Sequence, residues 1–192
     1  MGKLFVLIGK SASGKDFLMS QILIDCPHIK RLASYTTRPP RKGEENGREY
    51  FFVSDSFFEE KRREGKVVEE RVKKTLKGEA RYGTIAEGEN FVGSSYIAIK
   101  DPEGAERLKE YYGEDNVVII LVTVDDGIRL MRAITREMSQ QVPQYAELCE
   151  RFLSDEEDFK EVKPDFIIEN KDAMEAVQKL KGIIRENRKK QP

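Results

Sequence analysis

The chain has 192 residues, of which 39% are hydrophobic and 36% are charged, and its 34 basic and 35 acidic residues leave a net charge of −1. The length predicts one domain with a single sizeable core. The balanced charge argues against nucleic-acid binding through overall charge, so any anion site has to be local. The N-terminus carries no signal-peptide pattern, and no apolar run approaches the roughly 18 residues that span a bilayer. We therefore expect a cytoplasmic protein that does not enter a membrane.

The glycine-rich segment of residues 9–16 reads G-K-S-A-S-G-K-D. It follows the apolar run of residues 4–8, which is typical of a buried parallel strand, and it precedes apolar residues at helical spacing. Such a turn presents successive backbone N–H groups to one anion, and a lysine adds a mobile positive charge. The segment predicts a phosphate-binding loop (P-loop) for ATP, with the candidate ligands Gly9, Ser11, Ala12, Ser13, Gly14, Lys15 and Asp16.

Asp16 departs from the P-loop pattern, whose eighth residue is a Ser or Thr that binds Mg²⁺ through its hydroxyl. Mg²⁺ bound with ATP is the cofactor that this kind of loop predicts, which makes Asp16 a candidate metal ligand. Two interpretations of the aspartate stay open. Its carboxylate replaces or repels part of the usual Mg²⁺ coordination, or it is an acid placed in the first turn of a helix, where the helix dipole favours it.

Residues 34–52 combine hydroxyl side chains, three arginines and a tyrosine around a turn rich in Pro and Gly. The guanidinium group of an arginine grips two phosphate oxygens at once, and hydroxyl groups supply neutral donors. The segment therefore predicts a second phosphate site. The alternative is a basic surface loop whose arginines pair with the neighbouring glutamates.

The same segment resembles, without a gap, the GMP-binding pattern of guanylate kinases, S-x-T-T-R-x-x-R-x-G-E-x-x-G-x-x-Y-x-F. The resemblance implies an enzyme that converts ATP and GMP, or more slowly dGMP, to ADP and GDP or dGDP. It implies that Ser34, Arg38, Arg41 and Tyr50 bind the GMP phosphate. Arg38 would also touch the transferred group, and Glu44 would hold an arginine in place.

Three further stretches fit the GMP site of that family. Glu69, in a strand that begins at residue 67, takes the place of the acid that accepts hydrogen bonds from guanine N1 and N2, although Glu70 could take this role. In the Y-G-T sequence of residues 82–84, Tyr82 would reach the GMP phosphate and Thr84 the guanine carbonyl. Asp101 matches the second acid of the family's D-x-D-x-x-G motif.

The chain also departs from the family pattern at three places. Ile99 replaces the first acid of D-x-D-x-x-G, so an acid that often holds Mg²⁺ through water is missing. Lysines occur at positions 73, 74 and 77, where the family has a more aromatic hairpin, so the base pocket is expected to differ in detail. The stretch of residues 84–104 is short, which predicts the loss of a helix.

Two predicted helices, residues 126–138 and 145–158, carry several arginines on either side of a polar tip. Charged helices of this kind are often solvated faces. The family resemblance instead implies a lid, in which Arg132, Arg136 and Arg151 close over the phosphates and act with Lys15 and Arg38 in catalysis. Asn170 follows the predicted last strand and matches the family's adenine-site loop, which implies a contact with ATP.

The alternation of strands and helices predicts an α/β fold of the P-loop NTPase type, a parallel sheet flanked by helices. We expect a core of residues 1–33, 85–124 and 158–192, a GMP-binding lobe of mixed α/β structure at 34–84, and a helical lid at 125–157. Two other functions stay open: a guanylate-kinase-like module that binds phosphopeptides without catalysis, and an ATP-dependent kinase for another phosphorylated nucleotide or sugar.

Overall fold

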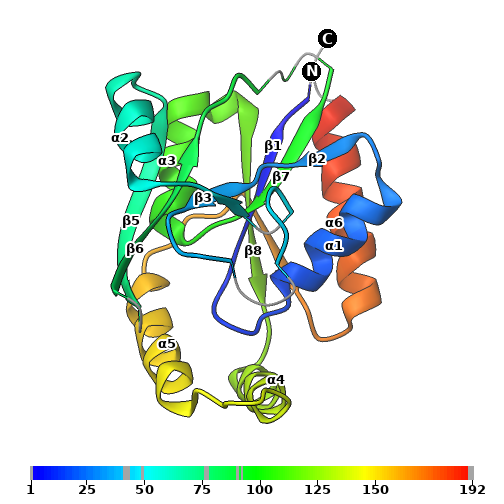
Figure 1. Ribbon diagram of the computed structural model, residues 1–192. Helices are drawn as coiled ribbons and strands as arrows, with labels where there is room; N and C mark the ends of the chain where they lie inside the picture. The colour runs from blue at the N-terminus through cyan, green and yellow to red at the C-terminus, as the bar shows by residue number, and fades with distance from the viewer. Residues whose placement is uncertain are drawn as a thin grey trace.

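A computed structural model describes residues 2–40, 44–48, 50–75, 78–89, 91 and 93–189 (Figure 1). Its strands are β1 (Leu4–Ile8), β2 (Ile29–Arg31), β3 (Ser34–Thr36), β4 (Tyr50–Phe52), β5 (Val67–Thr75), β6 (Gly78–Ile85), β7 (Ser95–Ile99), β8 (Val117–Thr123) and β9 (Phe166–Glu169). Its helices are α1 (Lys15–Asp25), α2 (Asp55–Arg63), α3 (Pro102–Tyr112), α4 (Asp126–Met138), α5 (Tyr145–Asp158) and α6 (Ala173–Lys189), with a 3₁₀ turn at Glu114–Asn116.

The first sheet is parallel and has the strand order β2-β7-β1-β8-β9, so that β1 lies at its centre. Every residue of β1 is at most 1% exposed. Because side chains alternate along a strand, Phe5 and Leu7 pack on one face with residues of α1 and α6, whereas Leu4, Val6 and Ile8 pack on the other with residues of α3. Figure 1 shows α1 and α6 on one side of this sheet and α3 on the other. The apolar run of β1 thus positions the P-loop that follows it.

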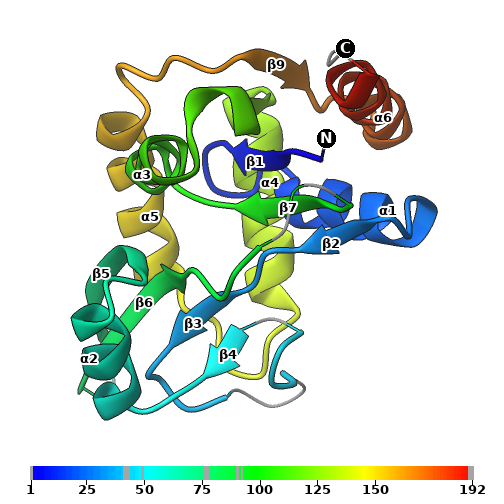
Figure 2. The same ribbon diagram turned by 90° about the horizontal axis from the view of Figure 1, so that it is seen from above.

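The second sheet has the order β4-β3-β6-β5 and mixes parallel and antiparallel pairs. Its helix, α2, begins at the N-cap Ser54, whose hydroxyl accepts a hydrogen bond from the backbone N–H of Phe57 at 3.2 Å. Phe58 of α2 is fully buried against Tyr35 and Ile85. Seen from above, this small sheet lies beside the first one (Figure 2).

Helices α4 and α5 follow β8 and form a separate arm, drawn at the bottom of Figure 1. Asp125 caps α4 by accepting hydrogen bonds from the N–H groups of Gly127 and Ile128. Both helices have the bounds that the sequence predicts. Within the described ranges, none of the helices combines the length and the apolar character that crossing a bilayer requires.

The predicted fold class is confirmed: a parallel sheet with helices on both faces, joined to a smaller mixed sheet. Between Ile85 and Ser95, the described residues form no helix. This agrees with the helix that the sequence predicts to be lost. The division into core, GMP-binding lobe and lid stays a prediction.

Candidate active site

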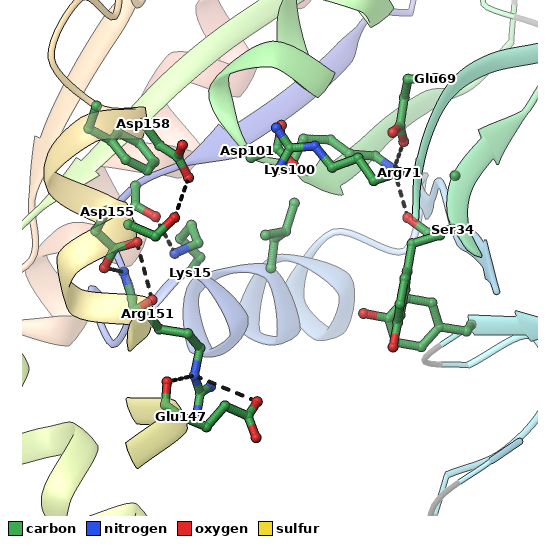
Figure 3. Close-up of a pocket in the computed structure, with 18 of the residues that line it drawn as sticks. Lys15, Ser34, Glu69, Arg71, Lys100, Asp101, Glu147, Arg151, Asp155 and Asp158 are labelled. Carbon is green, nitrogen blue, oxygen red and sulfur yellow. Dashed lines mark hydrogen bonds and ion pairs between the residues drawn. The ribbon is translucent and has the colours of Figure 1, made fainter. Parts of the chain in front are cut away.

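A cavity of about 490 Å³ opens at the carboxyl edge of the first sheet, where β1 and β7 end. Four parts of the chain line it: the P-loop, the second sheet with Arg38 next to it, the segment that joins β7 to α3, and α5. In Figure 3, Lys15, Asp155 and Arg151 lie on one side of the cavity and Ser34, Glu69 and Lys100 on the other. Ligands of open α/β sheets bind at this edge because the strand ends and helix N-termini meet there.

The P-loop has the backbone geometry that its glycines allow. Gly14 caps α1 with φ +95°, and a Cβ atom at this position would lie 2.1 Å from Nδ2 of Asn170. Lys15 donates from Nζ to the carbonyls of Gly9 at 2.6 Å and Lys10 at 3.0 Å, and to Oγ of Ser13 at 3.3 Å. Burial lowers the pKa of Lys15 below its ordinary value, and the nearby carboxylate of Asp16 opposes the shift.

Asn170 supports the P-loop from the end of β9. Its side chain is 2% exposed and donates from Nδ2 to the carbonyl of Ser13 at 2.7 Å. Its backbone N–H donates to the carbonyl of Thr123 at 2.7 Å, and its own carbonyl accepts from Arg132 at 3.2 Å. In this structure, Asn170 therefore fixes the loop that is expected to bind ATP.

An aspartate of α5 ties the helical arm to the P-loop. Asp155 accepts hydrogen bonds from the backbone N–H of Ser11 at 2.7 Å and from its hydroxyl at 3.2 Å. The same carboxylate pairs with Arg129 of α4 at 3.1 Å. The Arg129 side chain is only 2% exposed, and its guanidinium also lies 4.6 Å from the centre of the Phe152 ring. The three segments are thus joined through one buried charge pair.

Arg38 is held in place beside the cavity. Both Nη atoms donate to the carboxylate of Glu44 at 2.6 Å, and the guanidinium lies 5.1 Å and 5.4 Å from the ring centres of Tyr50 and Phe52. The hydrogen bonds to Glu44 raise the pKa of Arg38, while burial opposes this. Within the described residues, the buried Nε of Arg38 has no hydrogen-bond partner. An arginine that is oriented by a carboxylate and keeps a donor available is suited to binding an anion.

Tyr50 and Tyr82 line the cavity close to Arg38. Their rings meet edge to face with centroids 5.8 Å apart. Burial raises the pKa of the Tyr50 phenol, so the hydroxyl stays protonated at neutral pH and can donate a hydrogen bond. Together with Arg38, these phenols line the part of the cavity where the sequence predicts a second anion site, and anion binding there stays a prediction.

Glu69 lies at the other end of the cavity, and Glu70 faces away from it. Oε1 of Glu69 accepts from Oγ1 of Thr84 at 2.8 Å and pairs with Nζ of Lys100 at 2.7 Å. Glu70 instead pairs with Arg62 and Arg81 on the far side of the strand. Thr84 is fully buried beneath Glu69. The geometry therefore favours Glu69 over Glu70 as the acid that faces a ligand.

Asp101 begins α3 and also lines the cavity. Its Oδ1 accepts from the backbone N–H of Gly104 at 2.8 Å, and its Oδ2 pairs with Arg71 at 2.9 Å. Each carboxylate at this end of the cavity thus carries a basic partner.

The family model for guanylate kinase matches residues 1–187. The chain belongs to the guanylate kinase family. It is 30% identical to the guanylate kinase of Methylobacillus flagellatus over 97% of this chain and 90% of that protein, and 31% identical to that of Thiobacillus denitrificans over 96% and 86%. The crystal structure of guanylate kinase from Anaplasma phagocytophilum has a TM-score of 0.70 at 22% identity and covers 98% of this chain and 87% of that one, which supports the fold.

The arginines predicted for the lid occupy different positions in this member of the guanylate kinase family. Arg151 lines the cavity, and its Nη2 lies 3.5 Å from Oε1 of Glu137. Arg132 reaches the P-loop support at Asn170, and Arg136 is exposed on α4. Their roles in catalysis stay predictions.

Asp16 is exposed in the first turn of α1. Arg41 lies outside the described residues, so its place in the phosphate site stays a prediction.

Sequence reasoning missed several residues that line the cavity, among them Arg71, Lys100 and Asp155. Arg71 is two positions from Glu69 and therefore shares its face of β5, and Lys100 directly follows a buried strand of the first sheet. These positional signals were available in the sequence. Nothing local indicates that Asp155 contacts Ser11, because 144 residues separate them.

Proposed function

We propose that this chain transfers the γ-phosphoryl group of ATP to GMP, giving ADP and GDP, and that dGMP is a slower acceptor. The observation that carries the proposal is that Lys15 of the P-loop and the Arg38, Tyr50 and Tyr82 group line a single cavity. The relatives that match nearly the whole chain are guanylate kinases. Phosphoryl transfer depends on holding two phosphates in line and stabilising the charge on the moving group, which two facing anion sites accomplish.

On the donor side, the P-loop residues 9–16 bind the ATP phosphates through backbone N–H groups at the N-terminus of α1. Lys15 exchanges its contacts with the loop carbonyls for contacts with phosphate oxygens. Its charge then stabilises the transferred group. Asn170 acts by holding the loop in shape.

On the acceptor side, Arg38 uses the donor that Glu44 leaves available, and Tyr50 and Tyr82 add neutral donors. Arg41 and Ser34 complete the phosphate site in this proposal. Glu69 and Asp101 recognise guanine, because a carboxylate accepts from the donor groups that guanine carries at N1 and N2. Thr84 positions Glu69 through the hydrogen bond between them.

Mg²⁺ bound with ATP belongs to this proposal, and the residues present fit it. Mg²⁺ takes most of its ligands from phosphates and water and needs only one or two carboxylates. Asp16 is an exposed carboxylate directly after the P-loop lysine and can supply one oxygen. In the part of the chain that the structure describes, no cluster of three or more His, Cys, Asp or Glu residues could hold an ion by itself. The ion would neutralise phosphate charge.

The α4–α5 arm acts as a lid in this proposal, with bounds near residues 125 and 157. Arg132, Arg136 and Arg151 supply positive charge to the phosphates when the lid closes. Closure also excludes water, which would otherwise accept the phosphoryl group.

A coupled assay with ATP, Mg²⁺ and a panel of nucleoside monophosphates tests the function. We expect turnover of GMP, slower turnover of dGMP and almost none of AMP, CMP or UMP. Lys15→Met and Arg38→Ala should each cost about 3–4 kcal/mol of transition-state stabilisation, as the loss of charge-stabilising groups does. Arg62→Ala is the matched control, because Arg62 pairs with Glu59 and Glu70 away from the cavity. No turnover of any acceptor would refute the proposal.

A further inference from the structure

Lys100 is a buried cation in the wall of the cavity. It follows the last residue of β7, and its Nζ lies 2.7 Å from Oε1 of Glu69 and 2.7 Å from Oγ of Ser34. The side chains of Lys100 and Glu69 are 7% and 10% exposed. Figure 3 shows Lys100, Glu69 and Ser34 together at the end of the cavity opposite Asp155.

Stabilisation of the fold is a poor explanation for a buried ion pair between Lys100 and Glu69. Removing two charges from water costs several kcal/mol per ion, and apolar residues of similar size often stabilise a protein as well or better. The pair is also incompletely satisfied. An ammonium group has three donors, of which Lys100 uses two, and Oε2 of Glu69 accepts no hydrogen bond from the described residues. A donor and an acceptor thus remain available side by side in the cavity wall.

We propose that Lys100 determines base specificity: with Glu69 it forms a donor–acceptor pair that selects a purine carrying a 6-oxo group beside N1–H. This inference rests on the proposed function and names a residue that recognises its substrate. In guanine, the O6 acceptor lies next to the N1–H donor, so O6 receives a hydrogen bond from Lys100 while N1–H donates to Glu69.

Adenine reverses this pattern. Its amino group at C6 would face the ammonium of Lys100, and the lone pair of N1 would face the carboxylate of Glu69. Both charged groups would then be covered by a ligand that cannot pair with them, which is how polar sites reject analogues most strongly. Lys100 therefore contributes twice, by attracting O6 and by excluding the adenine amino group.

Binding measurements test Lys100 without requiring catalysis. The probes are GMP and 2-aminopurine riboside 5′-monophosphate, which keeps the amino group at C2 but has neither the oxygen at C6 nor the proton at N1. Their dissociation constants are measured by calorimetry for the unmodified protein and for Lys100→Met. A hydrogen bond to a charged group is worth about 10- to 100-fold in affinity, so GMP should bind Lys100→Met weaker by this factor. The analogue should change by less than about threefold, because it makes no such bond.

Two further variants serve as controls, one at Lys100 and one at a lysine outside the cavity. Lys100→Gln keeps a neutral donor and is a milder change if Lys100→Met fails to fold. It should reduce the ratio of the affinity for GMP to the affinity for the 2-aminopurine analogue by about 3- to 10-fold. Lys109→Met removes a lysine that pairs with Asp165 outside the cavity, and it should leave both affinities unchanged. Equal weakening of both ligands by the Lys100 variants, or unchanged GMP binding, would overturn the inference.

The result also separates this inference from the proposed function. If the unmodified protein binds GMP with the expected dependence on Lys100 but transfers no phosphoryl group, the inference stands and the kinase function fails. If GMP is phosphorylated and the preference does not depend on Lys100, the function stands and the inference fails. If GMP does not bind at all, both fail.

Discussion

Replacing Asp155 by alanine should destabilise the protein through Arg129. The substitution leaves a guanidinium that is 2% exposed without its buried partner and leaves the N–H of Ser11 without an acceptor. Breaking a buried pair from one side costs about 3–5 kcal/mol. Arg129 keeps its contact with Asp126 at 2.9 Å, but that carboxylate is 70% exposed. The exposed pair offsets part of the loss, so we expect about 2–3 kcal/mol.

Thermal unfolding followed by circular dichroism at pH 7 measures this effect. For a chain of this size, 1 kcal/mol corresponds to about 2–4 °C in Tm, so Asp155→Ala should lower Tm by about 4–12 °C. Amide hydrogen exchange in α5 should also accelerate, because the lost contact joins this helix to the P-loop.

The matched control is Glu157→Ala, in the same helix. Glu157 pairs with Lys160 at 2.7 Å, but the two side chains are 73% and 63% exposed. Such a pair is worth about 0–1 kcal/mol. If Asp155→Ala shifts Tm no more than Glu157→Ala, the buried pair does not stabilise the arm. The double variant Arg129→Met/Asp155→Ala gives a second check. It should show a coupling energy above about 0.5 kcal/mol relative to the single variants.

Three further predictions concern single residues. Gly14→Ala should lower the free energy of unfolding by at least about 2 kcal/mol and remove most of the kinase activity, because it adds strain at positive φ and displaces Asn170. Gly65 is the control: its φ is +69° and the space around it is open, so Gly65→Ala should show only the backbone strain, about 1 kcal/mol. Burial raises the pKa of Tyr35 to about 12, so between about pH 10 and 12 the unfolded chain loses a proton that the folded chain keeps. The free energy of unfolding therefore falls as the pH rises through this range. In Tyr35→Phe, the free energy of unfolding should fall less with pH over the same range. Asp16→Ser should change the Mg²⁺ concentration needed for half-maximal activity, and an unchanged value would show that Asp16 is only a residue of the helix start.

The elements with strong periodicity were predictable from sequence. The run of residues 4–8 is buried on both faces, and α4 and α5 have the predicted bounds. Short strands were not predictable: β2 and β3 have three residues each, and their pairing with β7 and β6 is set by long-range contacts. Propensity over three residues carries too little information to decide such pairing.

The side chains of the candidate site also differ in whether a local sequence pattern or a long-range contact places them. Lys15 and Arg38 occur in motifs with fixed spacing, so the sequence predicted that both belong to the site. Both line the cavity in the structure. The family pattern also implied that Glu44 holds an arginine in place, and in the structure this arginine is Arg38. Asp155 and Lys100 contact partners that are 144 and 31 residues away. Such contacts depend on how the sheets and α5 pack, which no local pattern encodes.

The charged contacts at the end of the cavity opposite Asp155 also join the two sheets. Lys100 and Asp101 directly follow β7 of the first sheet, whereas their partners Glu69 and Arg71 belong to β5 in the second. An increase in the separation of the sheets would stretch both ion pairs, and a ligand that pairs with these charges would change the attraction between the sheets. The distance between the two sheets is therefore coupled to the ion pairs in the cavity wall.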